Sequence, residues 1–547
     1  MSAARALLLV FLAVGAILRL SDLGTAPPGM HVDAAANAWT TSCLLARGTD
    51  WHGDPWPVFY SRGFGENQST LYYYLLLPFQ AALGMSPATT ALPSSFAGIA
   101  LIALAYAVVR RLFDDATGLV AAALVAVTPA FLLFGRSGHE SGVAPFLVLL
   151  PLFLALAAGL PPSREERTRP ALAFLAGLTA GLACYGYYAV RIFLPALAIG
   201  LLAVSWRRTS ELAARPDGRR AIGALAAGFL PPFLPLVWKH AVDPEIAKRG
   251  TEFLLWQPGE PTTTIAGRVL ARYASHFSPD FLFRTGDAFP LHVLPGSGPL
   301  RWAWLPFLLI GAVVVARSWR RSNAARAMAV WVLLWPVSDA FTRHPGPNLL
   351  RSTPGLVSLV ILAAIGIVAL WRAVAGSSAL RRRVAAAGLA TLLLVDAGLG
   401  VRGFFAGFTT RADLYRLFNA DVMEVAAWMK PRLASYDAVV FSALDSAALS
   451  QPFVLLLVGW DYDPARWFAE EREIERRPDT DRVRAFGKTV FLFDSSDLAR
   501  LAVYERNGVP DRVAIVARPG EWKRGTPSFV ARAPDGTPSL VVHEVLF

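Results

Sequence analysis

The segment Leu7–Leu20 reads LLLVFLAVGAILRL, and shortly after it Pro27–Trp39 reads PPGMHVDAAANAW. The first segment is apolar and, with its neighbours, approaches the roughly 20 residues that cross a bilayer as a helix. It lacks a small-x-small cleavage site, so we interpret it as an uncleaved first span and not as a signal peptide. The second segment is a Pro-Gly loop that places one carboxylate, Asp33, beside His31. The rest of the chain decides whether that carboxylate has a function.

The composition identifies an integral membrane protein. Of 547 residues, 54% are hydrophobic and 17% are charged, whereas about 25% are charged in a soluble domain. The net charge of +12 does not indicate a nucleic-acid partner, because the basic residues form short clusters between apolar runs, as cytoplasmic loops do. Those clusters are Arg110–Arg111, Arg164–Arg169, Arg207–Arg220, Arg317–Arg326 and Arg381–Arg383. Cys43 and Cys184 have no metal-ligand spacing and form no disulfide framework.

Apolar runs predict an all-α membrane domain with about eleven transmembrane helices. The runs lie near 6–22, 90–111, 117–134, 142–160, 171–185, 191–206, 221–238, 302–317, 327–342, 354–373 and 384–401. The pair at 171–206 is short and is split by YGYYAVR, so one kinked or re-entrant element is an open alternative. With the N-terminus inside, eleven spans place every Arg cluster in the cytoplasm. The same count places 23–89, 135–141, 239–301, 343–353 and everything after about 402 outside.

Two parts of the chain are predicted to form the outer face. In the first outer loop, LYYYLLLPFQAALG (71–84) is too short to span a bilayer and is expected to be an interfacial helix. We expect residues 1–401 to form the membrane domain and 402–547 a small α/β domain. Its short apolar runs, predicted as strands, are 437–444, 452–459, 488–495, 512–519 and 539–547. Its helical patterns are 422–430 and 463–477.

Polar residues gather at the predicted outer ends of the spans. The candidates are Asp33 and Glu66 for catalysis, Arg136, Tyr187, Arg191, Arg284, His344 and Arg351 for an anionic substrate, and His31, His139, Asp280 and Asp287 for an acceptor or loop role. Carboxylates and cations that face one compartment suit general-base activation of a nucleophile beside a bound anion. Each also has a plainer explanation. Asp33 is a typical helix N-cap, Arg136 and Arg351 are typical interface anchors, and YGYYAVR is typical of aromatic packing.

In order along the chain, these motifs resemble the GT-C superfamily of polyprenyl-phosphate-sugar-dependent membrane glycosyltransferases. The closer resemblance is to its protein O-mannosyltransferase-like and lipid A aminoarabinose-transferase-like members. The matching features begin with Arg19-Leu20, the PPG-x-x-x-D loop ending at Asp33, and Glu66 before Leu71–Leu76. They continue with Arg136, the Tyr-rich turn 185–191, the SPDFLF-x-x-GD loop 278–287, and His344, Arg351 and Pro354. The resemblance covers roughly residues 6–400.

The resemblance implies a mechanism. Asp33 would be the general base that deprotonates an acceptor hydroxyl, which then attacks the anomeric carbon with inversion. Arg351, Arg136 and His344 would neutralise the departing lipid phosphate, a role that suits the planar fork of Arg. Glu66 would orient substrate or a divalent ion. We expect Asp33 to share one chamber with guanidinium groups from distant parts of the chain.

The implied partners are a polyprenyl-phosphate-linked sugar, a glycan, lipid or protein acceptor and membrane lipids, with no nucleic acid. The implied location is a bacterial inner membrane, with the active site and C-terminal domain on the periplasmic or extracellular side. Two departures from the family matter. Ala34 stands where many relatives have an acidic residue, which disfavours a metal at this loop, although a divalent ion is left open. Asn67 stands where aminoarabinose-type relatives often have Lys, which disfavours that sugar.

Two other interpretations stay open. An oligosaccharyl- or O-antigen-ligase-type transferase would move a whole glycan from a pyrophosphate carrier, and oligosaccharyltransferases usually show a clear D-x-D metal motif, which the predicted outer loops 23–89 and 239–301 do not contain. A transporter or flippase of lipid-linked sugars would show inverted repeats and polar midplane residues, and charges are almost absent from the middle of the spans. An inactive scaffold would be insensitive to Asp33→Ala.

Overall fold

The computed structural model describes residues 3–64, 67–161, 167–246, 254–294, 296–376, 378–444, 451–477, 481–494 and 512–546. They form two compact units, each of which is described by itself. The first unit comprises Met1–Ser21, Ser94–Arg136 and Glu140–Phe404. The second comprises Asp22–Pro93, Ser137–His139 and Phe405–Phe547. The long helices α4 (Pro87–Leu112) and α18 (Ala379–Thr410) contribute residues to both units.

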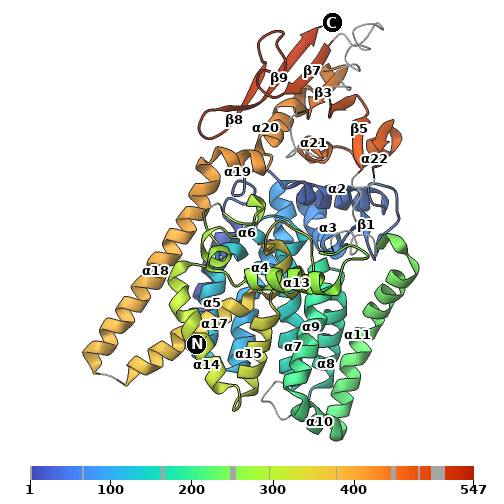
Figure 1. The fold of residues 1–547 in the computed structure, drawn as a ribbon. Helices are drawn as coiled ribbons and strands as arrows, with labels where there is room; N and C mark the ends of the chain where they lie inside the picture. Colours follow the sequence, from blue (N-terminus) through green and yellow to red (C-terminus); the bar gives the residue numbers. More distant parts are fainter. Residues whose placement is uncertain are drawn as a thin grey trace. The chain divides into compact units, whose positions relative to one another are not determined.

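The first unit is a helical bundle (Figure 1). Besides most of α4 and α18, its helices are α1 (Ala3–Leu20), α5 (Asp115–Val127), α6 (Pro129–Phe134), η1 (Glu140–Val143), α7 (Ala144–Ala157), α8 (Pro170–Ala183), α9 (Tyr188–Val204), α10 (Trp206–Ala214), α11 (Pro216–Val242), α13 (Thr262–Ser275), η2 (Asp280–Arg284), η3 (Pro290–His292), η4 (Trp302–Trp304), α14 (Leu305–Ser318), α15 (Asn323–Leu334), α16 (Val337–Ala340) and α17 (Leu349–Ala375).

Small residues let pairs of these helices approach closely. A Cβ on Gly177 of α8 would lie 2.0 Å from the Leu225 carbonyl oxygen of α11, and one on Gly366 of α17 would lie 1.9 Å from the Phe307 carbonyl oxygen of α14. Close contact of this kind is how membrane helices associate, because lipid tails offer no hydrophobic advantage to larger side chains. The guanidinium of Arg19 also ties α1 to α5, since it donates to the carbonyls of Val125 and Ala126.

The chain is a multi-pass membrane protein. Six helices of the described residues are long and apolar enough to cross a bilayer, namely α1, α4, η1–α7, α11, α17 and α18. The pair α9 and α10 would add a seventh, although it is bent by 80°. Helix α17 is 89% buried inside the protein over its most apolar window, whereas the equivalent window of α18 is 0% buried. An apolar helix whose side chains are not covered by protein needs lipid, so α18 has the surface of a helix that faces the bilayer.

Each of the eleven predicted runs falls on a helix or on two consecutive helices, but the count of eleven spans stays a prediction. Several of the predicted spans are short or broken helices: α5 and α6 for 117–134, α8 for 171–185, and α15 and α16 for 327–342. The alternative of one kinked or re-entrant element at 171–206 stays open, since α8 and α9 are separated by only the four residues 184–187. A further bend of 80° lies between α9 and α10.

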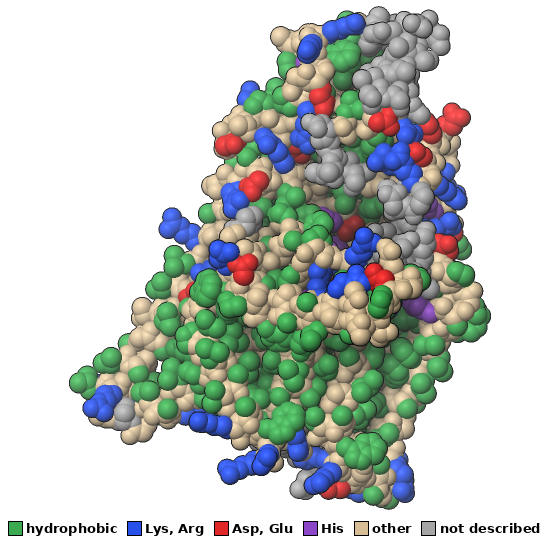
Figure 2. All heavy atoms as spheres, in the orientation of Figure 1, with side chains coloured by type: hydrophobic (Ala, Val, Ile, Leu, Met, Phe, Trp, Pro, Cys, Tyr) green, Lys and Arg blue, Asp and Glu red, His purple; other side chains and the backbone are tan. Residues whose placement is uncertain are grey.

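Basic side chains gather at one end of the bundle. Figure 2 shows apolar side chains over the bundle face and Lys and Arg concentrated at its lower end. The ion pair of Arg372, near the end of α17, with Asp114, before α5, joins two of the loops that meet there. Basic side chains are therefore concentrated at one end of the bundle, and the assignment of that end to the cytoplasm stays a prediction.

The second unit combines helices with a mixed sheet. Besides the first residues of α4 and the last of α18, its helices are α2 (Val32–Arg47), α3 (Leu71–Leu83), α19 (Ala412–Leu417), α20 (Ala420–Met429), η5 (Lys430–Ser435), α21 (Pro452–Trp460) and α22 (Pro464–Ala469). Its strands are β1 (Ser61–Arg62), β2 (Asn67–Gln68), β3 (Ala438–Ser442), β4 (Arg472–Glu475), β5 (Arg482–Phe486), β6 (Thr489–Leu492), β7 (Arg512–Ala517), β8 (Phe529–Arg532) and β9 (Pro538–Leu546).

The described strands β3 to β9 form one sheet in the order β4-β5-β6-β3-β7-β9-β8. Strand β3 is parallel to both of its neighbours, and the remaining pairs are antiparallel. One face of the sheet packs on α2, α20 and α21 through an aromatic core that includes Trp39, Trp51 and Trp467. The first outer loop and the C-terminal region therefore share one hydrophobic core, so the sheet supports the loop that carries Asp33.

Two secondary-structure predictions in the C-terminal region are wrong. The run PFVLLLVG, predicted as a strand, is helix α21, because all of its faces are buried against α2, α20 and the sheet. A short apolar run does not by itself distinguish a buried helix from a buried strand. The helix predicted over 463–477 ends at Ala469, after which Arg472–Glu475 form β4. The interfacial helix predicted at 71–84 is present as α3.

Candidate active site

Asp33 lies in the first turn of α2 between two histidines. Its Oδ2 atom is 3.4 Å from His31 Nδ1 and 3.3 Å from His139 Nε2, and a third of its side-chain surface is exposed. The His31 Nδ1 atom accepts a hydrogen bond from the Asp33 backbone N–H, so that nitrogen carries no proton to share with the carboxylate. His139 is therefore the imidazole positioned to share a proton with Asp33.

The N-cap explanation for Asp33 is wrong, because His31 is the capping residue. Asp33 instead stands inside the first turn, where the positive end of the helix dipole favours the ionised carboxylate. A general base requires that form. The carboxylate is thus in a place that favours its ionised form, and it is partly open to its surroundings.

The Pro-Pro-Gly loop positions this carboxylate. Gly29 has a φ of +66°, and a Cβ there would lie 2.4 Å from the carbonyl oxygen of Phe418. Met30 donates its backbone N–H to that same oxygen at 2.7 Å, and the Asn419 side chain donates to the Met30 carbonyl at 2.9 Å. The loop is therefore fastened to the turn between α19 and α20, and His31 and Asp33 follow at fixed positions. This close approach explains the glycine of the motif.

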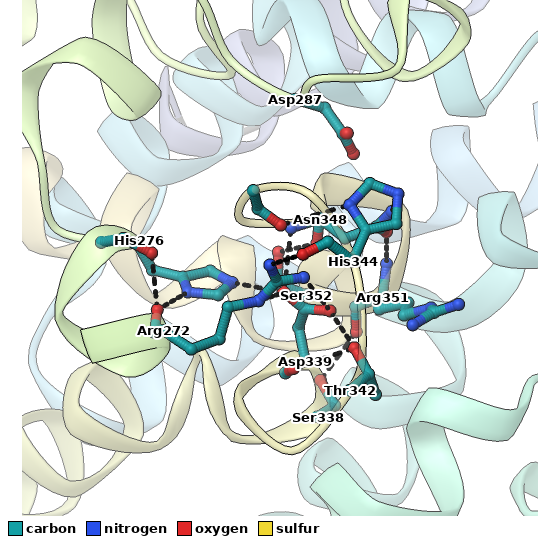
Figure 3. Close-up of polar contacts among 12 residues, drawn as sticks. Arg272, His276, Asp287, Ser338, Asp339, Thr342, His344, Asn348, Arg351 and Ser352 are labelled. Carbon is teal, nitrogen blue, oxygen red and sulfur yellow. Dashed lines mark hydrogen bonds and ion pairs between the residues drawn. The ribbon is translucent and has the colours of Figure 1, made fainter. Parts of the chain in front are cut away.

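His344 and Arg351 lie together at the start of α17 (Figure 3). His344 Nε2 is 3.1 Å from the Asn348 side-chain amide, and its ring lies against Phe289. Burial lowers the pKa of His344 below its ordinary value, and Arg351 and Arg272 lower it further, while Asp287 partly offsets them. A neutral His344 at pH 7 acts as a hydrogen-bonding group, which leaves Arg351 as the permanent cation of this pair.

Asp287 is a structural carboxylate. It is buried and accepts the backbone N–H of Leu349 at 2.7 Å, the backbone N–H of Phe289 at 2.9 Å and a contact from His292 Nδ1 at 2.7 Å. In the same turn, the backbone N–H of Arg351 donates to the Asn348 side chain. Helix N-termini often bind phosphate, but here a carboxylate and an amide oxygen already accept the N–H groups of Leu349 and Arg351.

The other candidate residues do not form one cluster with each other. Arg136 is buried and donates to the carbonyls of Leu18 and Ser21, so it binds the end of α1. Tyr187 is the N-cap of α9, and Arg191 lies over the Tyr188 ring and donates to the Cys184 carbonyl.

Asp280 and Arg284 form an exposed pair within η2, and this placement favours a surface turn over a substrate-binding role. Glu66 lies outside the described residues.

Sequence reasoning did not select the most buried charge cluster. Asp339 is fully buried and receives Arg272 Nε at 3.1 Å, His276 Nε2 at 3.2 Å and the backbone N–H of Asn348 at 2.9 Å (Figure 3). Thr342 also donates to it, and Arg272 reaches the His344 carbonyl at 2.6 Å. A signal was present in the sequence, because Asp339 interrupts the run predicted as a span at 327–342, where a lone carboxylate is costly without partners. The cluster holds the loop of His344 between α16 and α17.

No group of three or more His, Cys, Asp or Glu that could hold a metal ion occurs among the residues that the structure describes. The predicted role of Glu66 in binding a divalent ion stays a prediction, because Glu66 lies outside the described ranges.

Residues 68–234 match the family described as dolichyl-phosphate-mannose-protein mannosyltransferase. The chain is also similar to ArnT from Cupriavidus metallidurans bound to undecaprenyl phosphate, with a TM-score of 0.55 and 12% identity over 99% of this chain and 98% of that one. The fold is similar to that of ArnT.

A second similar structure is the archaeal oligosaccharyltransferase AglB from Archaeoglobus fulgidus, in complex with an inhibitory peptide and a dolichol-phosphate. The TM-score is 0.51 and the identity 14%, over 83% of this chain and 63% of that one, so this chain spans less than two thirds of AglB. No curated protein matches the chain. These findings bear out the resemblance to membrane glycosyltransferases that use a lipid-linked sugar.

Proposed function

We propose that the chain transfers one sugar from a polyprenyl-phosphate donor to an acceptor hydroxyl, with inversion, and that Asp33 is the general base. The observation that carries this proposal is the placement of Asp33. It is a partly exposed carboxylate in the first turn of α2, fixed by the Pro-Pro-Gly loop and flanked by His31 and His139. The family match and the fold support the donor class.

In the proposed reaction the acceptor oxygen forms a bond to the anomeric carbon as the bond from that carbon to the phosphate oxygen breaks. Asp33 takes the acceptor proton, and polyprenyl phosphate leaves with the electron pair. A positioned base of this kind contributes about 10²–10⁴ in rate. His139 holds the Asp33 carboxylate in place through Oδ2, so it is a positioning residue.

Arg351 is the proposed ligand of the departing phosphate, because it is a guanidinium in the first turn of α17 beside the neutral His344. Arg136 is a weaker candidate for this role, since it donates to the carbonyls that end α1. The proposals for Tyr187, Arg191 and Glu66 concern donor orientation and stay untested predictions, as does the shared chamber of Asp33 and the guanidinium groups. The proposed orientation places these groups outside a bacterial inner membrane.

The deciding experiment is mass spectrometry of envelope glycans, lipids and proteins from a deletion strain complemented with the wild type or with Asp33→Asn. We expect the deletion and Asp33→Asn strains to lack the same mass, equal to one sugar residue. Loss of a whole oligosaccharide would favour the oligosaccharyl or O-antigen-ligase interpretation, and accumulation of donor on the inner leaflet would favour a flippase. Full complementation by Asp33→Asn would refute the general-base proposal.

A further inference from the structure

A cavity of about 870 Å³ lies at the basic end of the first unit. Its wall combines the loop after α7, the bend between α9 and α10, and the turn between α14 and α15. It lies at the start of α15, whereas the His344 loop follows the other end of that helix and α16. The cavity is therefore separate from the proposed donor site.

The wall of the cavity is cationic. Arg207, Arg208, Arg215 and Arg326 line it, together with the carboxylate of Glu211. Arg215 is paired with Asp217, at 2.7 Å. Within the described parts of the chain, Arg207 and Arg208 have no hydrogen-bond or ion-pair partner for their side chains. An excess of unpaired guanidinium groups around one cavity attracts an anion, and Arg forks fit phosphate.

Two buried polar atoms at the wall lack partners. Ser205 is 2% exposed, and its hydroxyl has no hydrogen-bond partner among the described residues. Nε of Arg326 is likewise buried without a partner in the described structure, although another nitrogen of that side chain donates to Asn323. Native proteins satisfy nearly all buried polar groups, so these two atoms have hydrogen-bonding capacity left for a group that reaches them from the cavity.

Two tryptophans give the depth of the cavity relative to the bilayer. Trp206 is 65% exposed and Trp319 is 40% exposed, and both line the cavity where the apolar helices α9 and α14 end. Exposed Trp at the end of an apolar helix is typical of the headgroup region of a membrane. An anion at this depth is the headgroup of a lipid.

We propose that this cavity binds the phosphate-bearing headgroup of an anionic phospholipid, with the phosphate between Arg207, Arg208 and Arg326 and with the Ser205 hydroxyl as a donor. The volume is in the range of ligand pockets, and basic pockets between helices on the cytoplasmic side of a membrane bind such headgroups. The bound lipid joins the α9–α10 bend to the α14–α15 turn. The proposal is independent of the sugar-transfer reaction.

The test is native mass spectrometry of the full-length, delipidated protein in detergent, titrated with phosphatidylglycerol, with phosphatidylcholine and with inorganic phosphate. The test variant is Arg207→Gln with Arg208→Gln. The matched control is Arg219→Gln with Arg220→Gln, because these exposed arginines at the start of α11 belong to the same basic end but do not line the cavity. A melting curve of each variant shows that it is folded.

We expect phosphatidylglycerol to bind in preference to phosphatidylcholine, and the test variant to weaken its binding about tenfold or more. The control should change binding by less than about twofold, and Ser205→Ala should weaken it by a few fold. Equal losses in the test and control pairs would mean general surface attraction and would overturn the proposal. Binding of inorganic phosphate with no preference for phosphatidylglycerol would overturn the lipid assignment, and a folded test variant with unchanged lipid binding would overturn the site.

Discussion

Asp33 and Asp339 are both carboxylates beside histidine, yet their surroundings differ. Asp339 has no exposed side-chain surface and accepts from a guanidinium, a hydroxyl and a backbone amide, with His276 at 3.2 Å. Asp33 lies in the first turn of α2 and keeps a third of its side-chain surface exposed. Burial with full pairing makes a carboxylate a structural element, since nothing can approach it. Partial exposure at a helix start leaves an ionised oxygen that a substrate can reach.

The largest expected difference between the two carboxylates is catalytic. Asp33→Asn should lower sugar transfer by about 10²–10⁴, because the amide cannot accept the acceptor proton, and should leave the melting temperature close to the wild type. The measurement is transfer from a polyprenyl-phosphate sugar by the purified enzyme. Asp54→Asn, which changes an exposed carboxylate of the same unit that pairs with Arg62, serves as the control and should retain activity. Retained activity in Asp33→Asn would show that Asp33, like Asp339, is not the catalytic base.

The second prediction concerns stability. Asp339→Asn should destabilise the protein by about 3–5 kcal/mol, because it leaves the buried guanidinium of Arg272 without its counter-charge. Thermal unfolding in detergent measures this effect. The matched change Asp280→Asn, in an exposed pair with Arg284, should leave the unfolding transition unchanged. An Asp339→Asn protein that is as stable as wild type would show that the cluster is not structural.

The third prediction tests Arg351 as the phosphate ligand. Arg351→Gln should lower kcat/KM by about 10²–10³, and Arg351→Lys should restore only part of it because an ammonium lacks the planar fork. Arg317→Gln, an exposed arginine at the basic end of the bundle, should have no effect on transfer. Full activity in Arg351→Gln would show that another cation binds the phosphate, and Arg136 and Arg191 would be the next candidates.

The smallest expected effect is a pH dependence at His344. Its pKa is lowered in the folded protein, so the unfolded chain binds more protons between that lowered pKa and the ordinary value of about 6.5. Its contribution to stability is therefore present above pH 6.5 and is lost as the pH falls through that window. The melting temperature should drop less between pH 7.5 and pH 5 in His344→Gln than in the wild type. An identical drop in both proteins would contradict the assignment of a neutral His344.

Sequence patterns predicted the helices well because apolar runs and their Arg-rich ends report on local hydrophobicity, which needs no knowledge of neighbours. They also proposed Asp33, His344 and Arg351 as site residues, and these roles stay predictions. They misassigned PFVLLLVG, whose type depends on what surrounds it, and they missed Asp339, whose partners Arg272 and His276 are 67 and 63 positions away in the chain.

The sequence by itself determined three features of this protein. It is a membrane protein, its helices have basic residues at particular ends, and a Pro-Pro-Gly loop precedes a carboxylate. These follow from the transfer of side chains between water and lipid and from the backbone limits of Pro and Gly. Only the tertiary structure decided that the C-terminal sheet and the first outer loop share a core, that His31 caps α2, and that Asp287 and Asp339 are structural. Each of these depends on contacts between residues far apart in the chain, and those contacts exist only after the chain has folded.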